Sequence, residues 1–276
     1  QTEQIDSLTV AWPSGRRQSF ARLKANQLLT ITEPREPDPA SPAPASSSKP
    51  LFVESFLLRG VRREEVSFDD LSRQPLLPRR LSQQTFCMAW GDADGDGDND
   101  LFLGGVKGNG GRLFLRSAAG QFTPSAQPAF VLDKDSDDAA AVFFDFDSDK
   151  DLDLFVVTGG AREDSGHAAY RDRLYVNDGK GHFTQTSAGV LPDLRENGRC
   201  VAAADFDRDG DVDLFVGGHS VPGQYPLAEP SRLLANTSGK FVDQTPKALG
   251  AAGLVTDAIW SDADGDGWLD LLVMTE

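Results

Sequence analysis

The chain has 276 residues, which is long enough to bury a sizeable core, and its 39% hydrophobic and 25% charged content is ordinary for a folded soluble protein. Its 43 acidic and 27 basic side chains give a formal net charge of −16, which argues against nucleic acid or an anionic membrane as a partner. No stretch approaches the roughly 18 consecutive apolar residues that a membrane span needs. Cations are the expected counterpart of such a chain.

Residues 1–33 favour a small β unit. Residues 8–12 alternate between apolar and polar side chains, Pro13-Ser14-Gly15 predicts a turn, and residues 28–32 form a second β-prone run. A unit of this length is too short to hold a stable core by itself. It is therefore expected to be a fragment of a larger β module.

Residues 34–50 contain six prolines among seventeen residues, and alanine and serine fill much of the rest. This composition is typical of an extended interdomain linker. The sequence thus predicts a domain boundary here, followed by a repeat domain over residues 51–276. The chain begins at Gln1 without methionine and stops at Glu276 directly after an apolar run, so both ends are expected to be cuts in a longer polypeptide.

Four acidic clusters recur at similar intervals in the repeat domain. Their first aspartates are spaced by 53, 60 and 57 residues and are Asp92, Asp145, Asp205 and Asp262. Each cluster follows one short apolar run and leads directly into another, which predicts a loop between two strands. The first three repeats continue with two more β-prone runs joined by a glycine-bearing turn, which predicts a hairpin. The fourth repeat stops after two runs.

Four short antiparallel strands at a period in the fifties indicate a propeller blade. The predicted fold class is therefore all-β: a partial β-propeller of four-stranded blades, preceded by the small β module fragment. No segment of the repeat domain shows sustained helical periodicity, and residues 59–82 are compatible with one short helical turn.

The acidic charge is concentrated in the clusters. They hold 19 of the 43 acidic residues, so the rest of the chain carries 24 acidic and 27 basic side chains. A solvated acidic surface has no reason to gather its charge at four regularly separated places. Dedicated cation sites explain this distribution better.

Carboxylates occupy loop positions one, three, five and nine in all four clusters. Calcium takes six to eight oxygens in flexible geometry, and a tight loop delivers alternate side chains together with the backbone carbonyl of position seven. We therefore expect about four Ca²⁺ ions. The predicted metal ligands are Asp92, Asp94, Asp96, Asp98 and Asp100; Asp145, Asp147, Asp149, Asp151 and Asp153; Asp205, Asp207, Asp209, Asp211 and Asp213; and Asp262, Asp264, Asp266, Trp268 and Asp270.

Other metal sites fit these loops less well. An EF-hand would close with a glutamate at position twelve between two helices, whereas this position holds Leu103, Val156, Val216 and Val273 inside apolar runs. Zinc and copper prefer histidine or cysteine, which the loops lack, and magnesium prefers fewer carboxylates. Lys150 replaces the glycine of position six, so its loop is predicted to bind most weakly.

Cys87 and Cys200 each lie five residues before the first aspartate of a cluster. They are therefore expected at equivalent strand positions in repeats that are not neighbours, too far apart for a disulfide. Both are predicted to be buried thiols with a structural role.

The loops and their flanking strands, over residues 86–276, resemble the FG-GAP or VCBS repeat of integrin α-subunit propellers and of many bacterial surface proteins. Residues 8–33, with Val10-Ala11-Trp12-Pro13-Ser14-Gly15, look like the C-terminal part of an ASPIC/UnbV module. Such a module accompanies these repeats in the cartilage acidic protein family. The resemblance implies a propeller of about seven blades and an extracellular or cell-surface setting.

The preferred function is a calcium-binding structural or adhesive module whose partner is an extracellular protein or glycan, with no nucleic acid. No catalytic or other cofactor-binding residue is assigned. The alternative is a carbohydrate-binding or polysaccharide-degrading propeller protein. A degrading enzyme would need converging acid and base groups. The candidates outside the loops include the three histidines, His167, His182 and His219, and carboxylates such as Glu163, Glu196 and Glu229.

Two further segments carry weaker signals. Residues 221–226 contain Tyr225, which a sugar-binding protein would present at the surface, although a packed loop between blades is the better explanation. Asn236-Thr237-Ser238 fits a glycosylation sequon, and a plain turn is expected there instead.

Overall fold

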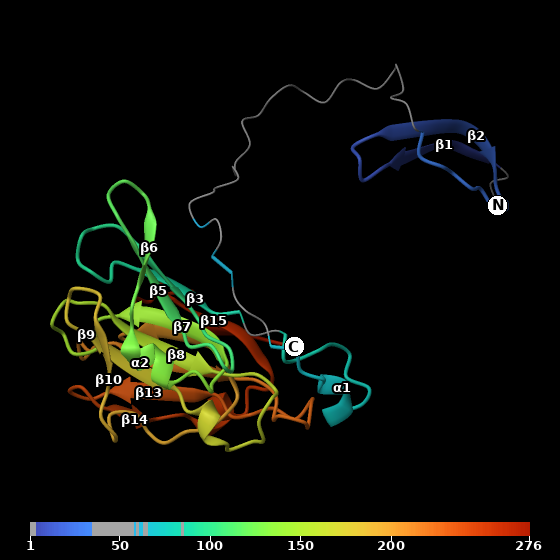
Figure 1. Cartoon of the computed structure of the whole chain (residues 1–276). Helices are drawn as coiled ribbons and strands as arrows, with labels where there is room; N and C mark the ends of the chain where they lie inside the picture. The colour runs from blue at the N-terminus through green and yellow to red at the C-terminus, as the bar shows by residue number, and fades with distance from the viewer. Residues whose placement is uncertain (1–3, 35–57, 59–60, 63–65, 84–85) are drawn as a thin grey trace. The chain divides into compact units, whose positions relative to one another are not determined.

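The structure, a computed structural model, describes residues 4–34, 58, 61–62, 66–83 and 86–276. The chain divides into two compact units, Gln1–Ser55 and Phe56–Glu276, which are drawn in Figure 1. The segment predicted as a linker, residues 34–50, lies outside the described residues except for Pro34.

The described part of the first unit contains one hairpin. Strands β1 (Gln4–Ala11) and β2 (Arg17–Lys24) pair antiparallel, with Ala11 opposite Arg17. Gly15 has a φ of +84° in the turn, as the Pro-Ser-Gly sequence predicts. The prediction of a second strand at residues 28–32 was wrong, because these residues form no strand. Pairing begins directly after the tight turn, where closing the short loop costs the least entropy.

In its described residues, the second unit contains three four-stranded antiparallel sheets and one two-stranded sheet, here called blades 1 to 4. Blade 1 consists of β3 (Met88–Gly91), β4 (Asp100–Leu103), β5 (Arg112–Arg116) and β6 (Phe122–Ser125). Blade 2 consists of β7 (Asp138–Phe144), β8 (Asp153–Thr158), β9 (Arg173–Asn177) and β10 (Phe183–Gln185). Blade 3 consists of β11 (Gly198–Ala204), β12 (Asp213–Gly218), β13 (Arg232–Asn236) and β14 (Phe241–Asp243). Blade 4 consists of β15 (Val255–Ser261) and β16 (Asp270–Thr275).

The blades lie side by side through their first strands. β3 is next to β7, β7 is next to β11, and β11 is next to β15. Within each blade the strands follow one another in sequence order. The predicted fold class, a partial β-propeller of four-stranded blades, is confirmed, and the fourth blade has two strands as the sequence predicts.

Apolar cores fill the space between consecutive blades. Between blades 1 and 2, the ring of Phe130 meets Phe102 and Tyr175 edge to face, with centroids 5.4 and 4.8 Å apart. Between blades 2 and 3, Phe146 and Phe241 stack at 5.6 Å. The second strands β8 and β12 are buried along their whole length because each has a blade on both faces. They therefore appear in the sequence as continuous apolar runs and not as alternating ones.

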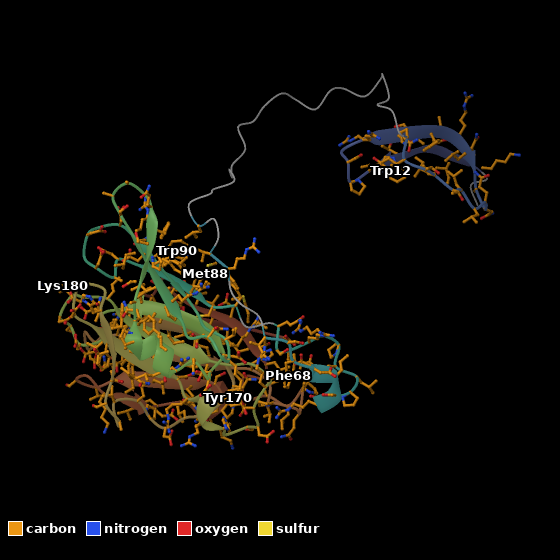
Figure 2. All side chains as sticks on the ribbon, viewed as in Figure 1. Trp12, Phe68, Met88, Trp90, Tyr170 and Lys180 are labelled. Atoms are coloured by element: carbon orange, nitrogen blue, oxygen red, sulfur yellow. The ribbon has the colours of Figure 1, made fainter. Side chains whose placement is uncertain are left out.

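The first strand of blade 1 is buried on one face only. Met88 and Trp90 are about half exposed, whereas Ala89 and Gly91 are buried, and Figure 2 labels the two large side chains. Trp90 packs edge to face against Phe122 at 5.9 Å. This alternation is the period of two that a half-buried strand requires.

Within the part of the chain that the structure describes, four short helices lie in the connections: α1 (Asp70–Arg73), α2 (Pro128–Leu132), η1 (Ala168–Tyr170) and α3 (Lys247–Gly250). The helical turn compatible with residues 59–82 is confirmed by α1, whose N-cap Asp69 accepts a hydrogen bond from the Ser72 N–H. The other three were not predicted, since segments of three to five residues are too short for the helical period to be recognised. Among the described residues, no helix combines the length and apolarity of a membrane-crossing segment.

The two cysteines occupy equivalent places against glycines near the end of a second strand: Gly104 directly follows β4, and Gly217 is the last residue but one of β12. A Cβ atom on Gly104 would lie 2.5 Å from the Cys87 Cβ, and one on Gly217 would lie 2.6 Å from the Cys200 Sγ. Both cysteines are buried and neither forms a disulfide, as predicted. Burial raises the pKa of the Cys200 thiol to about 11, so this thiol stays protonated at neutral pH.

Gly218 gives the first prediction, because it ends β12 where the chain passes close to another backbone segment. A Cβ at this position would lie 2.4 Å from the Glu229 carbonyl oxygen and 2.5 Å from that of Pro230. Backbone atoms cannot rotate away, so Gly218→Ala is expected to lower the free energy of unfolding by about 3 kcal/mol, the upper end of the usual overpacking cost. Urea unfolding followed by tryptophan fluorescence measures this loss. Gly250→Ala is the control, because its Cβ would meet nothing closer than 3.4 Å and should cost little.

Candidate metal centres

Each aspartate cluster connects the first and second strands of a blade, as the sequence predicts. We call them loop 1 (residues 92–100), loop 2 (145–153), loop 3 (205–213) and loop 4 (262–270). Position nine of every loop is the first residue of the second strand. The loops therefore recur at the same end of every blade.

The first aspartate of each loop closes the turn through the same hydrogen bond. Its Oδ2 accepts the N–H of position six, and the four donors are Gly97 at 2.9 Å, Lys150 at 3.0 Å, Gly210 at 3.1 Å and Gly267 at 3.0 Å. The aspartate of position five accepts the N–H of position seven at 2.7 to 2.9 Å in all four loops. These local side-chain bonds are the turn chemistry for which aspartate is favoured.

The backbone is left-handed at two positions of every loop. Position six has φ between +77° and +97°, and Lys150, with +77°, is the residue other than glycine there. Position four is also left-handed, and it holds Ser148 at +64° and Arg208 at +66° in loops 2 and 3. The left-handed turn expected at Lys150 is confirmed, whereas the one at position four was not foreseen. Each residue other than glycine at these positions, namely Ser148, Lys150 and Arg208, strains its loop by about 1 kcal/mol.

Three carboxylates of each loop meet closely enough to share one ion. Their oxygens lie within 4.8 Å of one another, and the four groups are Asp92, Asp94 and Asp96; Asp145, Asp147 and Asp153; Asp205, Asp207 and Asp213; and Asp262, Asp264 and Asp270. Loops 2 to 4 use positions one, three and nine, while loop 1 uses positions one, three and five. The predicted ligands outside these groups are Asp98, Asp100, Asp149, Asp151, Asp209, Asp211, Asp266 and Trp268, and the ligand role of all twenty residues stays a prediction.

Position nine joins the loop to the sheet. The Asp153 carboxylate is buried and accepts the Phe146 N–H at 2.8 Å and the Asn177 N–H at 2.9 Å. Asp100 and Asp213 make the equivalent pairs of bonds in blades 1 and 3. Burial raises the pKa of Asp153 and of Asp213 to about 6. Taking these carboxylates out of water therefore disfavours their charge, and a nearby cation would offset that cost.

The crowding also affects position three. Burial first, and then the charges of neighbouring loop carboxylates, raise the pKa of Asp94 and of Asp147. Two oxygens have no partner at all: Asp145 Oδ1 and Asp205 Oδ1 are buried and accept no hydrogen bond. A buried carboxylate oxygen without a donor is costly. Calcium is a hard cation that binds oxygen ligands, so a calcium ion in the loop would give this oxygen a partner.

Three of the side chains at position seven contact groups other than the loop carboxylates. Asp98 pairs with Arg116 at 2.6 Å, and Asp211 accepts the Ser238 N–H at 3.3 Å. Trp268 is half exposed, with the Arg208 guanidinium over its ring at 3.9 Å from the centroid. The role predicted for position seven, in which its backbone carbonyl binds the ion, stays a prediction.

Two asparagines contribute to the loops and were missed in the sequence. Asn177 and Asn236 end the third strands of blades 2 and 3, and each side chain donates to a backbone carbonyl in the loop of the preceding blade. A signal was present, because an asparagine follows Tyr175-Val176 and Leu234-Ala235 at the same place in two repeats. Asn236 is the sequon asparagine, and it is buried with its Nδ2 already bonded. The folded chain therefore does not present it for glycosylation.

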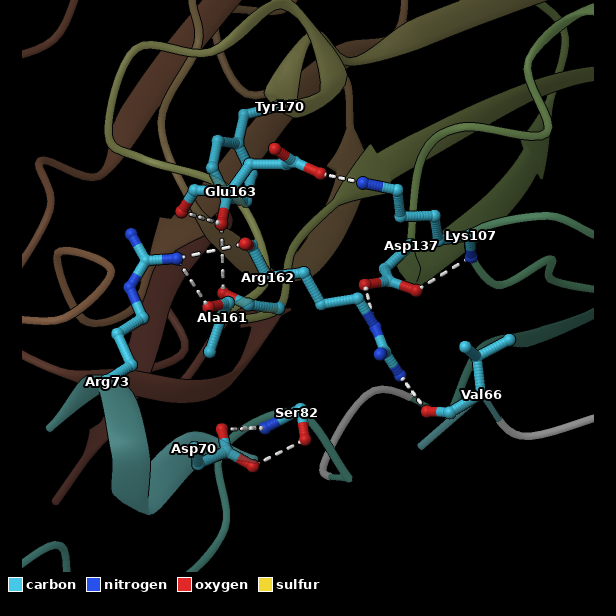
Figure 3. Close-up of polar contacts among 11 residues, drawn as sticks. Val66, Asp70, Arg73, Ser82, Lys107, Asp137, Ala161, Arg162, Glu163 and Tyr170 are labelled. Atoms are coloured by element: carbon cyan, nitrogen blue, oxygen red, sulfur yellow. Dashed lines mark hydrogen bonds and ion pairs between the residues drawn. The ribbon is translucent and has the colours of Figure 1, made fainter. Parts of the chain in front are cut away.

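The side chains considered for catalysis pair with neighbouring groups of the fold, and two of them, Glu163 and His167, lie 4.0 Å apart. Figure 3 shows Glu163 paired with Lys107, while the Tyr170 hydroxyl donates to the Glu163 carbonyl oxygen at 3.1 Å. Glu196 pairs with Arg232, and Glu229 accepts the Ser165 hydroxyl at 3.0 Å.

The three histidines have different surroundings. His167 caps η1, His182 pairs with Asp178 at 3.1 Å, and His219 is buried, which lowers its pKa to about 4. The backbone of Tyr225 makes two hydrogen bonds with the Gln74 side chain. Its N–H donates to Gln74 Oε1 at 2.9 Å, and its carbonyl oxygen accepts from Gln74 Nε2 at 2.6 Å, in agreement with a packed loop.

A cavity of about 420 Å³ lies beside the start of β9. Polar groups of Asp172, Gln185 and Thr186 and the apolar side chains of Leu191 and Pro192 are among its lining residues. None of the three glutamates considered for catalysis lines it. The carboxylates that do line it are those of Asp172 and Asp193, and Asp193 pairs with Arg171 at 2.9 Å.

Comparison with known families matches the two units separately. The family described as FG-GAP-like repeat matches residues 81–156 and 157–216, and the family described as ASPIC and UnbV matches residues 1–38. Cartilage acidic protein 1 of Mus musculus is 32% identical over 99 residues, and that of Xenopus tropicalis is 32% identical over 101 residues. Each alignment covers 36% of this chain and 15% of the relative, so the chain spans a small part of those proteins.

Among solved structures, a lectin of Agrocybe aegerita that recognises non-reducing terminal N-acetylglucosamine is similar at a TM-score of 0.45 and 18% identity. The similarity covers 67% of this chain and 45% of the lectin.

The left-handed Lys150 gives the second prediction. Lys150→Gly should raise the free energy of unfolding by about 1 kcal/mol, because glycine adopts a φ of +77° without strain. Urea unfolding without added metal measures this gain. Lys180, which is exposed and labelled in Figure 2, is the control, since its φ is not positive and Lys180→Gly should destabilise slightly. An equal effect of both substitutions would contradict the strain.

Proposed function

Because this chain carries FG-GAP-like repeats together with an ASPIC and UnbV segment, we propose that its four aspartate loops bind calcium and thereby form a rigid extracellular interaction module. The proposed ligands in each loop are the carboxylates of positions one, three, five and nine and the backbone carbonyl of position seven. The repeat family and the distant similarity to cartilage acidic protein 1 favour a non-enzymatic repeat protein.

The observation that carries the proposal is the pair of unpartnered oxygens in loops 2 and 3. Asp145 Oδ1 and Asp205 Oδ1 are buried at the point where three carboxylates converge within 4.8 Å. Unpaired buried oxygens at a purely structural turn would be costly. A divalent cation accounts for all of these oxygens at once, and calcium tolerates this number of carboxylates better than magnesium does.

The distribution of ion pairs also supports the proposal. At the other end of the blades, buried acids have arginine partners, such as Asp138 with Arg173 and Asp137 with Arg162 at 2.9 Å. Among the described loop aspartates, Asp98 is the one with a salt bridge to a basic side chain. The countercharge for the other loop carboxylates therefore has to come from solution.

The proposed setting is extracellular or at the cell surface, where loops of this kind bind calcium with dissociation constants of about 10⁻⁴ to 10⁻³ M. The proposed division of the chain is a C-terminal ASPIC/UnbV part over residues 1–33, a linker over 34–50 and a propeller segment from 51 onward. The proposed partner is an extracellular protein or a glycan, and the 420 Å³ cavity is a place where a glycan would find both polar and apolar walls.

The third prediction concerns stability. At 10 mM calcium, a site with a dissociation constant of about 0.1 to 1 mM adds about 1.4 to 2.7 kcal/mol to the free energy of unfolding. Differential scanning calorimetry is expected to show a higher Tm with calcium and a lower one with a chelator, while the same concentration of magnesium has a smaller effect. A Tm that responds to neither calcium nor chelator would exclude the proposed function.

The fourth prediction assigns the sites. The double variant Asp145→Asn and Asp205→Asn should remove two of about four calcium ions in isothermal titration calorimetry, because it neutralises the first carboxylates of loops 2 and 3. The control is Asp178→Asn and Asp193→Asn, which removes two exposed carboxylates outside the loops and should leave the number of bound ions unchanged. Equal losses in the two double variants would place the ions elsewhere.

A further inference from the structure

We infer that Asn177 and Asn236 couple the aspartate loops of neighbouring blades, so that an ion bound in one loop favours binding in the next. This inference rests on the proposed calcium function and adds a property to it: the sites fill cooperatively along the row of blades. The asparagines act as positioning residues, because they contact loop backbone and not the carboxylate groups of position one or three.

Asn177 holds loops 1 and 2 at the same time. Its Nδ2 donates to the Ala93 carbonyl oxygen in loop 1 at 2.7 Å and to the Leu152 carbonyl oxygen in loop 2 at 3.1 Å. Its backbone N–H donates to Asp153 Oδ1, the ninth position of loop 2, at 2.9 Å. The residue is buried, so water cannot replace any of these bonds if one loop moves.

Asn236 repeats the arrangement one blade further along. Its Nδ2 donates to the Phe146 carbonyl oxygen in loop 2 at 2.9 Å, and its backbone N–H donates to Asp213 Oδ1 in loop 3 at 2.8 Å. It is 1% exposed. Two independent repeats thus place an asparagine between consecutive loops with the same atoms bonded to the same loop positions.

The two asparagines complete one hydrogen-bonded row through three loops. In loop 1, the Ala93 N–H donates to Asp100 Oδ2 at 2.8 Å, and in loop 2 the Phe146 N–H donates to Asp153 Oδ2 at 2.8 Å. The peptide groups of position two therefore bond their own ninth aspartate on one side and the asparagine of the next blade on the other. The row runs Asp100, Ala93, Asn177, Asp153, Phe146, Asn236, Asp213.

Coupling follows from what each loop does when its ion is absent. Without a cation the crowded carboxylates repel, so the loop has an open and a closed arrangement whose balance depends on the ion. When loop 2 opens, Asp153 and Phe146 leave their places, and the buried groups of Asn177 and Asn236 lose partners. Loops 1 and 3 are then less well held in the closed arrangement. Linkage requires the effect to be reciprocal.

The experiment disables loop 2 and observes its neighbours. The full chain with Asp145→Asn and Asp147→Asn is compared with the unaltered chain by hydrogen exchange and mass spectrometry over a calcium titration. Protection of peptides covering residues 91–100 and 204–213 gives the calcium midpoints of loops 1 and 3. Both midpoints are expected to rise about five-fold when loop 2 cannot bind, which is at the lower end of measured couplings.

Introducing Asn177→Ala into both of these chains tests whether the coupling between loops 1 and 2 passes through Asn177. The loop 1 midpoint should then no longer respond to the state of loop 2, while the loop 3 midpoint still shifts through Asn236. Asn197→Ala is the matched control, because Asn197 is equally buried and donates to the Ser220 carbonyl oxygen at 2.6 Å within blade 3, away from the loops. It should leave both shifts unchanged. If Asn177→Ala does not fold, Asn236→Ala gives the same test for loop 3.

The outcomes separate the two proposals. Protection that does not change with calcium in any loop overturns both calcium binding and the coupling. Midpoints of loops 1 and 3 that stay constant when loop 2 is disabled overturn the coupling alone, as does a loop 1 shift that persists in Asn177→Ala.

Discussion

In blades 1 to 3, the buried carboxylate at the start of the second strand is the constraint on which the repeat depends. Asp100, Asp153 and Asp213 are at most 1% exposed, and each binds two backbone N–H groups, one in its own loop and one at the end of the third strand. A shorter or neutral side chain would leave one of these donors without a partner inside the sheet. The residue therefore fixes the loop to the blade, and it also brings a negative charge to a place where burial disfavours it. The two N–H donors stabilise that charge, and the proposed calcium ion would stabilise it further.

Most of the architecture was predictable from sequence because its causes are local. The two apolar runs around each cluster and the glycine-bearing turns after them set the strands and their order, and the structure places strands at every one of these runs in the repeats. The four loops were predictable for the same reason, since alternating aspartates and left-handed glycines need only their own neighbours to form the turn. The error at residues 28–32 has the opposite cause. Those residues are β-prone, but residues 17–24 lie next to the turn and take the pairing first.

The contacts between blades were not predictable in this way. Asn177 lies 84 residues from its partner Ala93, and Asn236 lies 90 residues from Phe146. Within its own repeat each asparagine appears as a turn residue before a glycine, which is a sufficient local explanation for its presence. The left-handed conformation of Arg208 was not predictable for a similar reason. Its guanidinium lies over the ring of Trp268 in the loop of the next blade, and this cation–π contact favours arginine at a position where the backbone favours glycine.

Apolar packing and the polar row through the loops act on different properties of the molecule. Each fully buried phenylalanine, leucine or valine between the blades contributes about 1.5 to 3 kcal/mol, whereas a typical hydrogen bond contributes about 1 kcal/mol net. The cores that include Phe102, Phe155 and Phe215 therefore decide whether the blades associate. The row of bonds from Asp100 to Asp213 decides how the blades are held relative to one another at one end. An ion that changes only the loops would then alter the stiffness and register of that end while the cores keep the blades together, which is the behaviour that a module with a defined binding surface requires.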